Sequence, residues 1–414
     1  MTGIRVLLLA LFVPMLIRLF RGKCGRLIWT DFLFIAFGIW NFVPLYVNTP
    51  AQALSYGGSV ILEFTGGYLL SRVYVRDRDS FIAMIKLLLL VIVITIPFTL
   101  IENMTARSLI PEMIRKLPVI DSIRDFNNAA AGKRMGLFRA QSVFDHPIHY
   151  GFFCSTAISL AFVGLRGVVS NVSRYLATIA AGLGVFLSLS SGAILPAILQ
   201  IGLILWAAML HKIEARWNIL LVLFALAYVT VDLLSNRTPI TVFLSHATFS
   251  SHNAYWRMII FDWGMKNVWA HPIFGLGLGD WVRPWYMRSG SMDNHWLLMA
   301  VRYGIPGFLL MASGFLLPLW TIAKRNFDDD RLLWQLRRAW MFTILSVALT
   351  LATVALWASV FSYLGFLFGA GMWFLSAEPA SAAVENDRKD ADTSPQRPTP
   401  YTRFAQSRER KRLA

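Results

Sequence analysis

The polar residues that open one apolar segment are the first candidates for chemistry. In SMDNHWLLMAVRYGIPGFLL (291–310), Asp293, Asn294 and His295 precede an apolar run, and Arg302 follows the histidine by seven residues. Seven residues are about two helical turns, so His295 and Arg302 project from one helix face, with the arginine roughly 10 Å deeper. Ionisable residues inside a membrane usually face a cavity, because lipid exposure costs several kcal/mol. The spacing predicts a polar cavity beside this helix.

Simpler interpretations of the same residues stay open. Asp293 or Asn294 is a suitable N-cap, since its side chain accepts hydrogen bonds from the first free backbone N–H groups of a helix. His295 at the surface of a membrane is also compatible with a solvated interfacial residue that has no chemical role.

Composition places the chain among polytopic membrane proteins. It is 56% hydrophobic and 15% charged, with a mean hydropathy of +0.55, whereas soluble domains carry about 25% charged residues. A spanning helix needs about 17–25 mostly apolar residues. We therefore expect an all-α transmembrane bundle of eleven helices, within a range of 10 to 12, with the two segments at 174–210 as an alternative re-entrant pair. The predicted spans are 3–20, 28–48, 52–71, 81–101, 148–165, 174–189, 191–210, 217–234, 296–322, 338–357 and 359–376.

Charge in the short connections predicts the orientation of these spans. Five basic connections, 18–26, 72–79, 166–174, 211–216 and 323–338, fall on one side of an eleven-span bundle, and positive loops stay cytoplasmic. The amino terminus is then outside, and span 3–20, which has no small-residue cleavage site, is a retained helix. We expect a domain over 1–376 and a disordered cytoplasmic tail over 377–414, which is rich in Pro, Ser, Ala and charge.

Two longer connections, about 102–147 and 235–294, then lie outside although both are basic. Long loops escape the charge rule in part, but arginines here also suit an anionic ligand, because the guanidinium donates two parallel hydrogen bonds to phosphate. In the first loop, 105–126 has the spacing of an amphipathic interfacial helix. Lys133, Arg134 and Arg139 follow, among glycines and just before a helix that begins near Pro147, which fits phosphate binding at a helix N-terminus.

The second loop predicts an amphipathic helix between His252 and Ala270 that carries Arg257 and ends before Pro272. GLGLG (275–279) follows a helix and not a strand, so it lacks the context of a dinucleotide site and predicts a tight turn that folds the loop back onto the membrane. The aromatic residues after it are expected to be interfacial anchors, with a sugar-stacking platform as the alternative. These aromatic residues are Trp281, Trp285 and Tyr286.

Four motifs taken together resemble a known family. FRAQSVFDHPIHYGFF, LSLSSGAILPAI, NAYWRMIIFDWGMKNVWAHPIFGLGLGDW and DNHWLLMAVRYGIPGFLL follow one another over roughly 134–310. Their order and spacing resemble the O-antigen ligase / O-antigen and exopolysaccharide polymerase family. The resemblance implies an α-helical glycosyltransferase of the bacterial inner membrane. Such an enzyme moves a glycan from undecaprenyl pyrophosphate to an acceptor hydroxyl at the periplasmic face, with inversion and without metal or cofactor.

The resemblance also implies roles for individual residues. Arg257 matches the arginine that contacts the pyrophosphate, His295 the histidine that activates the acceptor, and Arg139, or alternatively Arg134, the basic residue of the first outer loop. The family often has Ser-Arg-Gly where this chain has SSG, with Ser191 at the arginine position. Arg302 and Lys133 are the candidates to replace that charge.

This chemistry agrees with the residues themselves. Arginines stabilise the charge of a pyrophosphate leaving group, and a histidine can take a hydroxyl proton near neutral pH. Cys24 and Cys154 give neither a disulfide framework nor a metal spacing. We expect a polymerase that joins lipid-linked units, with a ligase acting on lipid A core as the alternative. Its partners would be the lipid-linked glycan, an acceptor glycan, the bilayer and other polysaccharide assembly proteins, and no nucleic acid.

Two rivals from other classes remain. A flippase for lipid-linked sugars would also use basic cavities, but transporters generally show internal repeats with broken helices in matching positions, and the sequence has no such symmetry. A membrane scaffold would leave the polar entrance at His295 unexplained.

Overall fold

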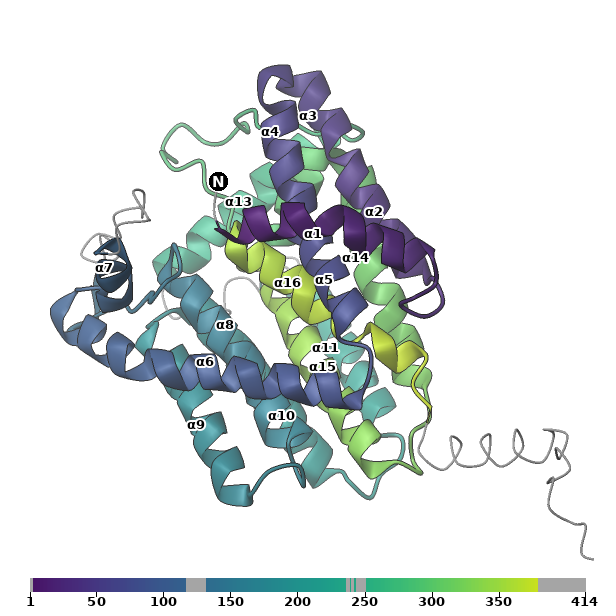
Figure 1. Cartoon of the computed structure of the whole chain (residues 1–414). Coiled ribbons are helices and arrows are strands. Elements are labelled where there is room, and N and C mark those ends of the chain that lie inside the picture. The colour runs from purple at the N-terminus through teal and green to yellow at the C-terminus, as the bar shows by residue number, and fades with distance from the viewer. Residues whose placement is uncertain (1–2, 117–131, 236–238, 240–241, 243–250, 379–414) are drawn as a thin grey trace, which may run out of the picture.

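The computed structural model describes residues 3–116, 132–235, 239, 242 and 251–378. These residues are almost entirely helical, and Figure 1 shows α15 and α16 in the middle of the bundle. The elements are α1 (Gly3–Phe20), α2 (Trp29–Trp40), α3 (Phe42–Asn48), α4 (Pro50–Val60), η1 (Ile61–Thr65), α5 (Gly66–Tyr74), α6 (Arg78–Thr105), α7 (Leu109–Arg115), β1 (Lys133–Arg134), β2 (Leu137–Phe138), α8 (Pro147–Ser159), η3 (Leu160–Gly164), α9 (Asn171–Leu187), α10 (Ser191–Met209), α11 (Arg216–Leu234), α13 (Ser251–Ala270), α14 (His295–Lys324), α15 (Arg331–Thr350), α16 (Ser359–Gly369) and η4 (Met372–Leu375).

The predicted all-α polytopic class is confirmed. Within the described residues, seven helices are long and apolar enough to cross a membrane: α1, α2 with α3, α6, α8 with η3, α10, α11 and α14. Three of the four other predicted spans also fall on helices, at α4 to α5, α9 and α16. Helices suit this environment because each satisfies its own backbone hydrogen bonds without water.

One predicted span is misplaced. The segment expected over 338–357 is helical only to Thr350, the end of α15, and residues 351–358 form an irregular connection to α16. This connection is apolar but buried, with Leu351, Val354 and Leu356 at most 3% exposed. Hydropathy cannot distinguish a buried apolar connection from a helix, which is why the prediction failed here.

Helix α14 is broken at Gly304, and the glycine-rich turn after α13 fits into the break. Gly304 has φ 71° and ψ 178°, and a Cβ atom there would lie 1.9 Å from the Ile273 carbonyl oxygen. The amides of Leu276 and Gly277 donate to the carbonyls of Val301 and Arg302 at 2.8 and 3.0 Å. These bonds satisfy backbone that the helix leaves free, as an apolar surrounding requires. The predicted turn at GLGLG is confirmed, and it holds residues 295–303 as a separate short helix.

The first outer connection contains a small hairpin that the sequence did not predict. Strands β1 and β2 pair antiparallel around Met135 and Gly136, which both have positive φ, as a two-residue hairpin turn requires. Of the amphipathic helix expected over 105–126, the described part is helical at α7, and the rest lies in 117–131, outside the described residues. The helix start expected near Pro147 is confirmed by α8.

The remaining predictions have mixed outcomes. The helix expected between His252 and Ala270 is confirmed by α13, and two of its large aromatic residues, Tyr255 and Trp269, are 50% and 68% exposed. Cys24 and Cys154 are buried and unpaired. The predicted tail lies outside the described residues from 379 onward.

Candidate active site

A pocket of about 1010 Å³ lies where α4, α8, α13, α14 and the connection 351–358 meet. It brings together five of the seven residues selected from sequence: Arg134, Arg139, Arg257, His295 and Arg302. Its volume is that of a large ligand site, since such pockets measure roughly 300–1,000 Å³. Six arginines face it against two carboxylates, so its walls favour an anion. The charged lining residues are Arg5, Arg134, Arg139, Arg257, Arg288, Arg302, Glu63 and Asp293.

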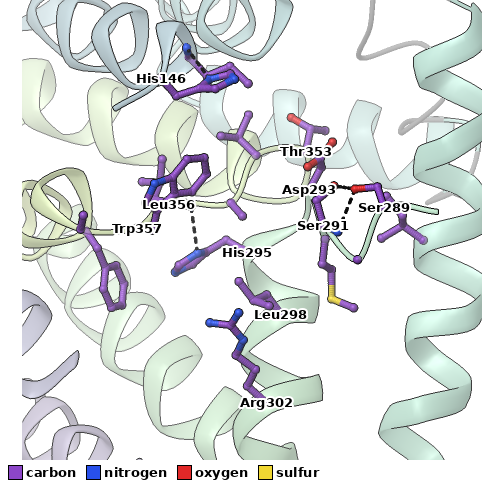
Figure 2. A pocket seen from close by; sticks show the side chains of 18 of the residues that line it. His146, Ser289, Ser291, Asp293, His295, Leu298, Arg302, Thr353, Leu356 and Trp357 are labelled. Carbon is purple, nitrogen blue, oxygen red and sulfur yellow. Dashed lines mark hydrogen bonds between the residues drawn. The ribbon is translucent and has the colours of Figure 1, made fainter. Parts of the chain in front are cut away.

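His295 is fully enclosed at the start of α14. Its backbone amide donates to the Leu351 carbonyl at 2.7 Å, and its Nδ1 accepts from the Leu356 amide at 3.3 Å (Figure 2). The ring also lies 5.1 Å from that of Phe361. Because Nδ1 accepts, the neutral ring carries its proton on Nε2, which has no hydrogen-bond partner among the described residues. In this tautomer Nε2 is a hydrogen-bond donor. The role in acceptor activation that the family resemblance implies for His295 stays a prediction.

Arg302 lies below His295 on the same helix face. Figure 2 shows its guanidinium directed from the next turns of α14 toward the histidine ring, as the seven-residue spacing predicts. Its Nη1 donates to the hydroxyl of Tyr56 on α4. The phenol holds the guanidinium against the pocket wall without neutralising its charge.

Arg139 is a buried cation that no carboxylate pairs with in the described part of the chain. It is 7% exposed, and its Nε has no hydrogen-bond partner there. Burial, and then the nearby charge of Arg134, lower the pKa of Arg139 to about 10, so it is still protonated at neutral pH. A buried charge without a partner is costly, and an anion in the pocket would relieve that cost.

Two residues at the end of α6 fix the backbone around Arg139. The Glu102 carboxylate accepts from the amides of Gln141 and Ser142, both at 3.0 Å. Asn103 donates to the carbonyls of Phe138 and Leu187. Because the predicted span ended at residue 101, these residues were expected at the start of a loop. In the structure α6 continues four residues further, to Thr105.

The hairpin separates Arg134 from Lys133. Arg134 Nη1 donates to the Leu189 carbonyl at 2.9 Å, beside Ser190 and Ser191, which also line the pocket. Lys133 instead lies over the Phe138 ring at 4.5 Å and is not among the lining residues. Neighbouring strand residues point to opposite sides, so only one could reach the turn. The guanidinium hydrogen-bonded beside the SSG turn is therefore that of Arg134, and Lys133 does not line the pocket. Arg302 does line it, and its role in replacing the charge stays a prediction.

Asp293 and Arg257 interact across the pocket rim, and burial perturbs both. Burial raises the pKa of Asp293, and the Arg257 charge partly opposes this. Burial lowers the pKa of Arg257, and Asp293 partly opposes it. Asn294 is the helix cap that the simpler interpretation foresaw: its Oδ1 accepts from the Leu297 amide at 3.0 Å, and it does not line the pocket.

The aromatic residues after the glycine-rich turn separate into different environments. Trp281 is 6% exposed and donates through Nε1 to the Gly290 carbonyl, so the interfacial anchor expected there is wrong. Trp285 is 93% exposed. Tyr286 lines the pocket, where the sugar-stacking alternative remains a prediction.

Sequence reasoning missed several lining residues, of which Arg5, Glu63 and His146 are charged or titratable, whereas Arg288 belongs to the basic second outer connection. Arg5 and Glu63 were detectable, because each is an ionisable residue within an otherwise apolar span. His146 caps α8 by accepting from the Ile148 amide at its Nδ1, at 3.1 Å. Within the described residues, no group of three or more His, Cys, Asp or Glu could hold a metal ion.

Comparison with known proteins points to one family. The family model described as O-antigen ligase matches residues 176–312, about a third of the chain. The match includes α10, α13 and the kinked start of α14, and therefore Ser191, Arg257, His295 and Arg302. No curated protein matches the chain. The resemblance inferred from the four motifs is confirmed.

Proposed function

We propose that this multi-pass membrane protein, whose residues 176–312 match the O-antigen ligase family model, polymerises undecaprenyl-pyrophosphate-linked oligosaccharide units. The family supports a glycosyltransferase-like membrane enzyme. The observation that carries the proposal is the buried guanidinium of Arg139, whose Nε has no hydrogen-bond partner among the described residues, in a pocket with six arginines. A ligase that delivers the glycan to lipid A core or another acceptor is the second candidate, since it would use the same site.

In the proposed reaction the arginines bind the lipid pyrophosphate. Arg139, Arg134 and Arg257 donate to its oxygens, and their charge stabilises the electron pair that leaves with it. The stabilisation is effective because the arginines are held in place before the substrate binds. The Glu102 carboxylate holds the backbone that follows Arg139, and the Leu189 carbonyl holds the Arg134 guanidinium. Displacement in one step inverts the anomeric carbon and needs no metal ion, provided that charge stabilisation comes from these side chains.

His295 contributes as a donor in this proposal. With Nδ1 occupied by the Leu356 amide, the Nε2–H group is available for a substrate oxygen at the junction of glycan and pyrophosphate. Arg302 lines the cavity below it. This assignment replaces proton removal by His295, which would require the other tautomer and loss of the Leu356 bond.

Orientation and boundaries are part of the same proposal. The pocket is formed by segments of the two connections that charge reasoning puts outside, so the site would face the periplasm from the bacterial inner membrane. Residues 1–376 would form the transferase unit and 377–414 a cytoplasmic tail.

A transfer assay in lipid tests the function. Wild type and His295→Ala are compared on undecaprenyl-pyrophosphate-linked repeat units without added metal. We expect a ladder of longer lipid-linked products from wild type, and loss of that ladder in a variant that still inserts in the membrane. Product only when lipid A core is supplied would identify a ligase. Binding of donor without product from either acceptor would identify a transporter, and a fully active His295→Ala would remove His295 from the mechanism.

A further inference from the structure

Glu63 is a buried carboxylate that lines the pocket. It is 5% exposed and lies in η1, a π-helical turn between α4 and α5, and such turns occur frequently at functional sites. Tyr56, Ser59, Val60 and Glu63 all line the pocket. Their spacing of three and four residues places them on one helix face.

Arg5 fixes the orientation of this carboxylate. Its Nε and Nη2 donate to the same atom, Glu63 Oε1, at 2.7 and 2.6 Å. No hydrogen bond from the described residues reaches Oε2. A carboxylate held through one oxygen, with the other free toward a cavity, is arranged to accept a hydrogen bond from a ligand hydroxyl.

The other polar groups of the pocket are poor candidates to accept a proton. The arginines only donate. His295 and His146 both use Nδ1 to accept from a backbone amide, which leaves Nε2 protonated in the neutral ring. Asp293, the second carboxylate, interacts with Arg257 at the rim, in the part assigned to the pyrophosphate. Glu63 instead shares its part of the lining with Tyr56 and Tyr303, and its ion-pair partner is Arg5.

From this geometry we propose that Glu63 is the catalytic residue that binds the acceptor hydroxyl and removes its proton, with Arg5 as its positioning residue. The inference rests on the proposed function. The hydroxyl proton passes to Glu63 Oε2, and the acceptor oxygen forms a bond to the anomeric carbon. The bond from that carbon to the pyrophosphate oxygen breaks, and its electron pair leaves with the lipid pyrophosphate. Glu63 then releases the proton to water, which returns the enzyme to its starting state. The acceptor in this step is a sugar hydroxyl.

Glu63→Gln tests the proposal, because it keeps the shape of the side chain and removes its basicity. A general base contributes about 10²- to 10⁴-fold, so we expect kcat to fall at least about 100-fold while Kd for the lipid-linked donor stays within threefold. Glu112→Gln is the matched control. Glu112 also pairs with an arginine, Arg107, but on the exposed surface outside the pocket, and its rate should equal that of wild type.

Two further variants separate catalysis from folding. Glu63→Asp keeps the charge and should retain an intermediate rate even if the glutamine variant is unstable. In Glu63→Ala, added formate should restore part of the rate, which a structural role would not allow. A wild-type rate in Glu63→Gln, loss of donor binding together with rate, or no rescue by formate in a folded variant each overturns the proposal. So does loss of transfer in Asp293→Asn with Glu63→Gln active. Failure of the proposed function is distinct, because then wild type itself makes no product.

Discussion

Two arginine–carboxylate pairs in the amino-terminal part of the bundle, each with a buried carboxylate, differ in how fully their polar atoms are hydrogen-bonded. In the Arg72–Asp31 pair, Arg72 Nε lies 3.1 Å from Asp31 Oδ1, and Tyr68 donates to the same oxygen. The Ile28 amide donates to Oδ2 at 3.0 Å. The remaining Arg72 nitrogens donate to the Cys24 and Arg26 carbonyls.

The Arg5–Glu63 pair is incomplete by comparison. Both of its contacts go to one carboxylate oxygen, and the pair borders the large pocket. We call a polar group closed when the protein satisfies all of its atoms, and open when some are left for a ligand. Buried polar groups are normally satisfied, so open groups gathered around one cavity indicate where a ligand binds. The first pair connects helices with its polar atoms hydrogen-bonded, whereas the second leaves Glu63 Oε2 without a hydrogen bond from the described residues.

Breaking the closed pair should have the largest effect on stability. Arg72→Met leaves Asp31 buried without its cation, and loss of one partner of a buried pair costs about 3–5 kcal/mol. We expect a large drop in melting temperature or in the yield of folded protein in detergent. Arg5→Met is the comparison, and it should lower stability less, because the Arg5 side chain is already 29% exposed. Equal losses of stability would contradict the distinction between closed and open pairs.

Removing an open cation should preserve stability and weaken donor binding. Arg139→Ala deletes a buried charge that the described residues do not neutralise, so the melting temperature should stay the same or rise. A hydrogen bond to a charged group contributes about 1.5–3 kcal/mol, so Kd for the lipid-linked donor should rise roughly 10- to 100-fold.

Lys133→Ala is the matched control for Arg139→Ala. It also removes one positive charge from the first outer connection, but from outside the pocket, so donor binding should not change. A lower melting temperature of Arg139→Ala with unchanged donor binding would show that Arg139 is closed after all.

The sequence was sufficient for features that depend on local periodicity. The apolar runs predicted the helices, and the seven-residue spacing placed His295 and Arg302 on one face. Features that depend on contacts between residues far apart in the chain could not be predicted from the sequence. The break at Gly304 requires the turn at 271–279, and the position of Glu63 requires Arg5, 58 residues away. Lys133 and Arg134 were equivalent as sequence neighbours, and only the hairpin separates them.

His146 caps α8 and also lines the pocket, and its titration should appear in the pH dependence of stability. Burial and the charges of Arg139 and Arg134 lower its pKa from 6.5 to about 4. The folded protein therefore resists protonation that the unfolded chain accepts, so stability is complete above pH 6.5 and is lost as the pH falls toward 4. By linkage we expect this group to remove roughly 2 kcal/mol between pH 7 and pH 4.5.

His146→Asn isolates the contribution of His146. Asparagine also accepts at a helix N-cap but does not titrate, so denaturation curves at pH 7 and pH 4.5 should differ less in this variant than in wild type. The same pH dependence in both proteins would assign the acid loss to other groups.

Asn294 provides the smallest and most selective test, because its side-chain oxygen caps a helix directly beside an open group, His295. Its side chain accepts from the Leu297 amide, while Nε2 of the next residue, His295, has no hydrogen-bond partner in the described part of the chain. Loss of an N-cap costs about 1 kcal/mol, so Asn294→Ala should lower stability by that amount and leave the transfer rate unchanged. Asn294→Ser keeps a capping oxygen and should restore the stability. A lower rate in both variants at full occupancy of the donor would instead mean that Asn294 contacts the substrate, and that adjacency along the chain had predicted the site better than the hydrogen bonds do.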